Sequence, residues 1–204
     1  MNRIPQMIEA AHTYSLDRAD HGRISIESVS PEIDGGRYPI KREVGDTIAV
    51  SADIFRDGHE SISADLYFKL SYRSTWDSVP MRFVDNDRWS GQFTVSENAR
   101  YDYTIAAVPD HYKTWCTEIG KKAAAGLDVH LEIAEGLLHL RSAIDLQGPG
   151  SDAIQNFWDV AAAAESQAEA MQFLTSPKLA QLMHDALPHA ERVWYRHVLT
   201  ATVD

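Results

Sequence analysis

Two periods of hydrophobic residues divide the chain. From Ile24 to about Trp115, apolar and polar residues alternate, most clearly over residues 48–54 and 62–72. A period of two turns one face of a strand towards a core and the other towards water. Further strands are expected at 79–84, 89–95 and 101–107. Short strands with turn residues between them predict an antiparallel, immunoglobulin-like β-sandwich.

Two short polar segments predict turns in this part of the chain. Asp57-Gly58 lies between the two clearest strands, and its glycine tolerates the positive φ of a tight hairpin. Asp85-Asn86-Asp87 precedes Trp89 and also predicts a hairpin turn. The alternative there, a calcium loop, requires a glycine and a distal glutamate that do not follow in register.

After Trp115 the hydrophobic period becomes helical. The first helical stripe comprises Leu127, Leu131, Ala134, Leu137, Leu138 and Ile144. The segment 147–151 (Gln-Gly-Pro-Gly-Ser) breaks it, and a second stripe runs from Ile154 to Leu174. Ser176-Pro177 predicts the cap and first residue of a short third helix, which ends before Pro188.

The period of two returns near the end of the chain, at Val193, Tyr195, His197 and Leu199. We therefore expect an α+β fold, in which a helical hairpin or bundle is inserted before the last strand of the sandwich. The expected organisation is an N-terminal extension (1–21), a sandwich (22–117 and 190–204) and a helical insert (118–189). The chain stops straight after a strand without a polar tail, which favours one piece of a longer protein.

Net charge and composition limit which binding partners and which cellular compartment are expected. The 204 residues carry a formal net charge of −11, which argues against nucleic acid or an anionic membrane as partner. The sequence contains neither a signal peptide nor an apolar run long enough to span a membrane. Its one cysteine, Cys116, fits a reducing compartment. We expect a cytoplasmic protein.

The residues offer no recognisable catalytic or cofactor site. The spacings of His130 to His139 and of His184 to His189 are not those of zinc ligands, and neither a Gly-x-Ser-x-Gly elbow nor a His-Glu-x-x-His motif occurs. Asp34-Gly35-Gly36-Arg37 is too short for a phosphate loop and predicts an extended crossing with close backbone packing. We therefore expect no catalytic residue, no metal ligand and no cofactor in this chain.

Two kinds of surface remain as candidates. The helical stripes favour contact with a second copy of the chain, unless both stripes pack on each other and on the sandwich. The interface candidates, or the seam beneath them, are Leu131, Leu138, Phe157, Trp158 and Met171. A weaker alternative is an α-glucan platform at Trp76 or Trp115, whereas Trp89 is expected in the core.

A long series of motifs carries a resemblance to a known family. The series comprises Gly22-Arg23-Ile24, Val29-Ser30-Pro31, the segment from Asp34 to Lys41, Gly45-Asp46, the segment from Ala52 to His59, Asp87-Arg88-Trp89, Tyr101-Asp102-Tyr103-Thr104, the segment from Asp110 to Trp115, and the tail from Leu199 to Asp204. The chain thus resembles the N-terminal domain of α-1,4-glucan:maltose-1-phosphate maltosyltransferases, which belong to the α-amylase clan (glycoside hydrolase family 13).

The resemblance implies a role within a larger enzyme. That family extends a glycogen-like α-1,4-glucan from maltose 1-phosphate with retention, using two carboxylates on a downstream (β/α)₈ barrel. No catalytic residue of the family maps onto this chain. The resemblance therefore implies a non-catalytic module of a retaining glycosyltransferase of glycogen biosynthesis, which serves homodimerisation and docking to its own barrel. The alternative is a carbohydrate-binding module for α-glucan.

Overall fold

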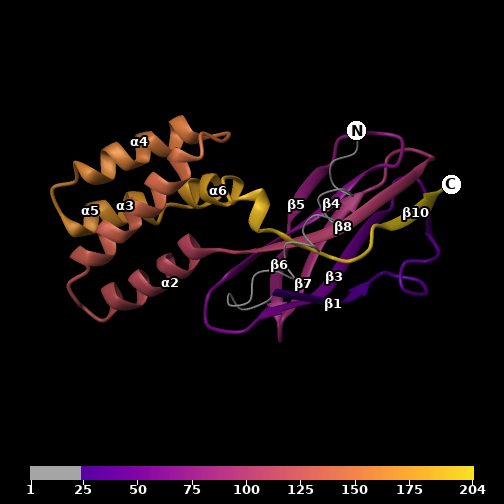
Figure 1. Ribbon diagram of the computed structural model, residues 1–204, viewed down its shortest axis with the longest axis horizontal. Helices are drawn as coiled ribbons and strands as arrows, with labels where there is room; N and C mark the ends of the chain where they lie inside the picture. The colour runs from indigo at the N-terminus through magenta and orange to yellow at the C-terminus, as the bar shows by residue number, and fades with distance from the viewer. Residues whose placement is uncertain (1–23) are drawn as a thin grey trace. The chain divides into compact units, whose positions relative to one another are not determined.

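The computed structural model describes residues 24–204 (Figure 1). The predicted extension 1–21 and the motif residues Gly22 and Arg23 lie outside the described residues. The described residues divide into two compact units: the first is formed by residues 24–109 together with Ala190–Asp204, and the second by Asp110–His189.

The first unit is built from strands in two sheets. A four-stranded sheet has the order β1-β3-β7-β6, with every neighbouring pair antiparallel. A six-stranded sheet has the order β2-β10-β8-β4-β5, and β9 pairs with β8. Among the described strands of this sheet, β10 and β2 pair in parallel and the other pairs are antiparallel. The strands are β1 (Ile24–Ser30), β2 (Ile40–Arg42), β3 (Thr47–Arg56), β4 (Ile62–Leu70), β5 (Asp77–Pro80), β6 (Arg82–Asp85), β7 (Arg88–Thr94), β8 (Arg100–Pro109), β9 (Val193–Trp194) and β10 (Leu199–Val203).

One apolar cluster joins the two sheets. The alternating residues Ile48 and Val50 of β3 are fully buried, and they belong to the same cluster as Leu66 of β4 and Ile105 of β8. Trp89 is buried in this cluster as expected, and its indole N–H donates to the Ile54 carbonyl at 3.1 Å. The period of two therefore identified the strand faces that form the core.

The connections between strands differ from the expectation at two points. The hairpin predicted at Asp57-Gly58 is wrong, because β3 and β4 lie in different sheets and Gly58 (φ +103°) turns the chain between them. The single strand predicted at 79–84 is two strands, β5 and β6, also in different sheets, with the buried Met81 between them. A local alternation cannot show which sheet a strand joins.

Two short segments, one expected as a turn and one as an extended crossing, have distinct outcomes. The hairpin at residues 85–87 is confirmed: Asn86 (φ +40°) and Asp87 (φ +64°) connect the antiparallel strands β6 and β7. Residues 34–37 form a turn rather than an extended crossing, although close packing is present at Gly36. A Cβ added at Gly36 would stand 2.6 Å from Cδ2 of Leu199.

The second unit is helical, and its helices are α2 (His111–Ala124), α3 (His130–Asp145), α4 (Ser151–Ala162), α5 (Gln167–Leu174) and α6 (Pro177–Asp185). The expected alternation up to Trp115 is wrong, because α2 begins at His111. Asp110 caps this helix, since its carboxylate accepts a hydrogen bond from the Lys113 backbone N–H at 2.9 Å.

Two further boundaries in the helical unit were set by serine caps. The second predicted stripe is two helices, because Ser166 caps α5 after a break at residues 163–166. The Ser176-Pro177 start of α6 is confirmed: the Ser176 hydroxyl accepts from the Leu179 N–H at 3.3 Å.

A 3₁₀ turn, His189–Glu191, precedes β9, and the expected final strand is the two strands β9 and β10. The α+β class is confirmed, with mostly antiparallel sheets and five helices in the described part of the chain.

Candidate interaction surface

Helix α3 carries leucine side chains on two opposite sides. Its inner side contributes the buried Leu140 and Ala143 to the core of the helical unit. Its outer side presents Leu131 and Leu138, which are 78% and 67% exposed. These two residues are seven positions apart, about two helical turns, and therefore lie on one side of the helix.

Two further exposed leucines flank the helix. Leu127 lies just before α3 and Leu146 just after it, and each is more than half exposed. We refer to Leu127, Leu131, Leu138 and Leu146 as the outer leucine row. Single exposed apolar residues are ordinary, but a row of them along one helix is typical of an interaction surface.

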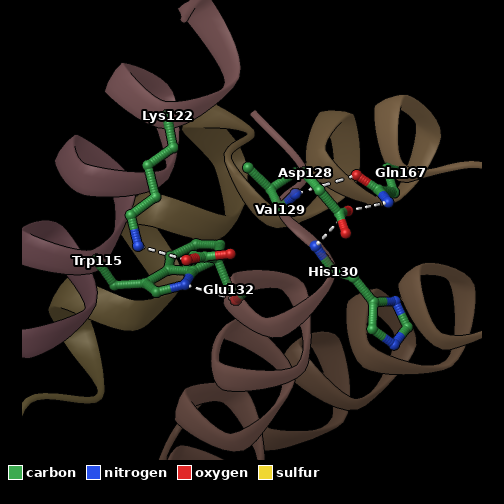
Figure 2. Close-up of polar contacts among 7 residues, drawn as sticks. All are labelled: Trp115, Lys122, Asp128, Val129, His130, Glu132 and Gln167. Atoms are coloured by element: carbon green, nitrogen blue, oxygen red, sulfur yellow. Dashed lines mark hydrogen bonds and ion pairs between the residues drawn. The ribbon is translucent and has the colours of Figure 1, made fainter. Parts of the chain in front are cut away.

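The start of α3 is fixed by a cross-link to α5 (Figure 2). Asp128 Oδ1 accepts hydrogen bonds from the Gln167 side-chain amide at 2.6 Å and from the His130 backbone N–H at 3.2 Å. The Gln167 amide oxygen in turn accepts from the Val129 N–H at 3.2 Å. The hydrogen bond from Gln167 to the Asp128 carboxylate, followed by that from the His130 N–H, holds the pKa of Asp128 below its ordinary value.

The same corner is joined to α2 through Glu132 (Figure 2). The indole N–H of Trp115 donates to the Glu132 carbonyl at 2.7 Å, and the Lys122 ammonium pairs with the Glu132 carboxylate. This hydrogen-bonded pair raises the pKa of Lys122 and lowers the pKa of Glu132. The outer leucine row therefore begins on a rigid corner, which reduces the entropy lost on binding a partner.

The five predicted interface residues separate into two groups. Leu131 and Leu138 are exposed, whereas Phe157, Trp158 and Met171 are half-buried and pack against the core of the helical unit. The exposed pair thus lies on the outer surface, and the other three belong to the seam.

One charged side chain connects α3 with this seam. The Arg141 guanidinium lies 5.5 Å from the centre of the Trp158 ring. This distance is within the range of a cation–π contact, so Arg141 is held at the exposed surface of α3 beside the half-buried aromatic residue.

The two tryptophans considered for glycan binding lie in different surroundings. Trp115 is only 3% exposed, because Tyr112 stacks against it at 5.6 Å and Gly136 lies against its ring. Trp76 is half-buried, and the Lys69 ammonium lies 5.1 Å from its ring centre. Burial leaves Trp115 no ring face for a sugar, and Trp76 keeps only part of its surface.

Sequence reasoning missed three members of this surface. Leu146 was not included in the helical stripe, although its apolar side chain at the end of α3 was a usable signal. The cross-link between Asp128 and Gln167 joins residues that are 39 positions apart. Nothing in the local sequence indicates that such a pair meets in space.

Comparison with known proteins places the chain in a family. The family model for alpha-1,4-glucan:maltose-1-phosphate maltosyltransferase, domain N/S, matches residues 22–204. The chain belongs to this family. We refer to it below as the maltosyltransferase N/S family.

Individual maltosyltransferases are also similar. The chain is 43% identical to that of Myxococcus xanthus over 127 residues, covering 60% of this chain and 19% of the relative. It is 43% identical to that of Chlorobaculum tepidum over 123 residues, covering 59% and 18%. For Cereibacter sphaeroides the identity is 44% over 125 residues, covering 61% and 21%. The matched part is about a fifth of the length of these relatives.

Within residues 24–204, no group of three or more histidine, cysteine or acidic side chains is arranged to hold a metal ion. In the same part of the chain, every helix is too short or too polar to cross a membrane. Burial raises the pKa of the Cys116 thiol. The exposure of the outer leucine row makes it the candidate interaction site.

Proposed function

We propose that this chain is the non-catalytic N-terminal module of a maltosyltransferase, and that its helical unit supplies a surface for homodimerisation. The main support for this proposal is the exposure of the outer leucine row along α3. In this proposal the first unit is an immunoglobulin-like sandwich with the helical unit inserted before its last strand. The other half of the role is docking to the catalytic barrel of the same protein.

The proposed parent enzyme is a retaining glycosyltransferase. It transfers maltosyl units from maltose 1-phosphate to α-1,4-glucan during glycogen biosynthesis. Membership of the N/S family supports this assignment, since the relatives carry that activity in their names. We also propose a cytoplasmic setting, which the single cysteine favours.

The charges beside the row support pairing with a second copy. Glu135 and Arg141 are both exposed, and they lie three positions before and three after Leu138. If two α3 helices pair antiparallel about Leu138, each Glu135 stands at the same level along the helix pair as Arg141 of the other copy. The same arrangement brings Leu131 towards the end of the helix that carries Leu146. A symmetric, self-complementary contact of this kind is what a twofold dimer requires.

A charge-reversal series tests this pairing by sedimentation equilibrium. Because like charges would then stand at the same level of the helix pair, R141E is expected to weaken the dimer. The double variant E135K/R141E is expected to restore association, since the opposite charges meet again with their positions exchanged. Equal circular dichroism spectra establish that the variants fold. Dimerisation unaffected by R141E would contradict the antiparallel arrangement.

Glycan binding is a second proposed function for the N/S module. Trp76 is the remaining tryptophan candidate, because part of its surface is exposed. Titration with a maltooligosaccharide separates this role from dimerisation, since an assembly surface alone gives no saturable signal.

A further inference from the structure

The loops at one end of the first unit hold an exposed tyrosine in a fixed position. Tyr72 follows β4 and is 70% exposed. The sequence pattern placed it on the buried side of a strand reaching residue 72, but β4 ends at Leu70 and the chain turns there. The Arg73 N–H donates to the Leu70 carbonyl at 2.9 Å, which closes this turn.

The loop after β4 is bonded to the start of β8. The Ser71 N–H donates to the Arg100 carbonyl at 2.8 Å, and the Ser71 hydroxyl donates to the Asp102 carboxylate at 2.7 Å. Lys69 adds a third link, because its ammonium donates to the Arg73 carbonyl at 3.0 Å and lies 3.5 Å from the Asp102 carboxylate. The backbone beside Tyr72 is thus held from both sides.

The neighbouring loop between β7 and β8 is also fixed. The Tyr101 hydroxyl oxygen accepts hydrogen bonds from the backbone N–H groups of Ser96 at 3.0 Å and Glu97 at 3.1 Å. Since the Tyr101 ring is buried in the core of the first unit, this contact anchors Glu97 to a rigid support. The two loops therefore present their outer side chains without much freedom.

Two of these outer side chains, Arg73 and Glu97, form a small polar network with Tyr72. The Tyr72 hydroxyl donates to Glu97 Oε2 at 2.9 Å, and the Arg73 guanidinium lies 3.5 Å from Glu97 Oε1. The hydroxyl bond fixes the ring while most of its surface remains in water. Glu97 and Arg73 are each about half exposed and keep hydrogen-bonding capacity towards solvent.

We propose that Tyr72, Arg73 and Glu97 form a surface binding site for an α-1,4-glucan chain. A pyranose has an apolar C–H face that stacks on an aromatic ring, and a rim of hydroxyls that bind carboxylate and guanidinium groups. The acidic and basic groups balance one another, which suits a neutral ligand. The inference rests on the proposed function, since the glucan is the polymer named for the relatives.

Tyr38 provides a matched control within the same unit. Its ring is about half exposed and also has an arginine and an acidic residue nearby, Arg37 and Asp34. In contrast to Tyr72, an arginine covers its ring: the Arg37 guanidinium lies 5.4 Å from the ring centre. Y38A therefore removes an exposed tyrosine without removing the proposed site.

Calorimetric titration of the full 204-residue chain with maltoheptaose tests the site. Saturable binding is expected for the unmodified chain and for Y38A, and at least about tenfold weaker binding for Y72A, because the ring is the stacking partner. E97Q is expected to weaken binding less.

The association state of Y72A in sedimentation should match that of the unmodified chain, so failure of this site is distinguishable from failure of the assembly surface. Equal binding by Y72A, binding lost equally in Y38A, or no saturable binding by the unmodified chain would overturn the proposal. So would a change in the sedimentation of Y72A without a change in glucan binding, since that identifies a protein contact.

Discussion

Gly136 of α3 lies directly against the indole ring of Trp115 in α2. A Cβ built on Gly136 would stand 2.4 Å from Cζ2 of that ring, a distance that real Cβ atoms do not show. Since the ring is buried and its N–H donates to the Glu132 carbonyl, it has little room to move. The absence of a side chain at Gly136 is what lets α2 and α3 approach here.

G136A is therefore expected to destabilise the helical unit. Overpacking costs about 1–3 kcal/mol, which outweighs the gain of about 1 kcal/mol from replacing a helical glycine with alanine. The matched control is G120A in α2, where an added Cβ meets nothing within 4 Å and stability should rise by about 0.5–1 kcal/mol. Urea unfolding followed by the helical circular dichroism signal measures both. Equal effects of the two substitutions would show that the ring contact is unimportant.

The cross-link between Asp128 and Gln167 makes a separate prediction. Q167A removes the donor to the Asp128 carboxylate and the acceptor of the Val129 N–H, and should lower the urea midpoint of the helical unit. A double-mutant cycle with D128A tests whether the two side chains act together. Because D128A removes the same contact, the double variant should lose less than the sum of the single losses. Strict additivity would argue against the cross-link.

The buried ion pair of Asp65 and Arg192 predicts that the stability of the first unit depends strongly on both side chains. The guanidinium lies 2.5 Å from the carboxylate, and both side chains are buried in the first unit. D65A leaves a buried positive charge and should cost about 3–5 kcal/mol. The double variant D65A/R192M should recover part of that loss, because no buried charge remains. Denaturant unfolding measures the cycle, and a double variant less stable than D65A would contradict this account.

His139 should make the helical unit sensitive to acid. Burial lowers the pKa of His139 below its ordinary value of 6.5; Glu135 and Asp110 oppose this shift, and His111 adds to it. The folded state therefore favours the neutral imidazole, while the unfolded chain takes up a proton from about pH 6.5 downwards. The stability due to this residue is present above that pH and is lost as the pH falls towards the folded pKa.

The measurement is urea unfolding between about pH 7.5 and about pH 5, for the unmodified chain and for H139Q. Glutamine does not titrate, so the difference in stability between the two proteins should change in favour of H139Q as the pH falls. A difference that stays constant over this range would contradict the role of burial at His139.

The sequence predicted the strand faces and the helical unit better than the connections. Alternation identifies which side chains of β3 are buried, because each residue points opposite to its neighbour. It cannot show that β3 and β4 belong to different sheets, because sheet membership depends on hydrogen bonds between distant segments. The same alternation predicts a strand that continues to Tyr72. In the structure β4 ends at Leu70, where a turn closed by the Arg73 N–H begins.

For the surface, the pattern identified the leucines but not their direction. Leu131, Leu137 and Leu138 were assigned to one stripe, yet Leu137 faces the helical core while the other two are exposed. A helix that is apolar on two sides gives no clear stripe, so only packing reveals which side is covered. The exposure of Leu131 and Leu138 is accordingly a structural finding and the main basis for the proposed assembly surface.

Sedimentation equilibrium of the unmodified chain and of L131E/L138E tests whether the outer leucine row is the surface through which two copies associate. Burying a leucine is worth about 1.5–3 kcal/mol, so two charged replacements per copy should raise the dissociation constant at least about 100-fold. V160E is the control, because Val160 is an exposed apolar residue of α4 outside the outer leucine row. A concentration-dependent dimer is expected for the unmodified chain and V160E, and a monomer for L131E/L138E. A dimer that survives in L131E/L138E, or an unmodified chain that remains monomeric at all concentrations, would contradict this expectation.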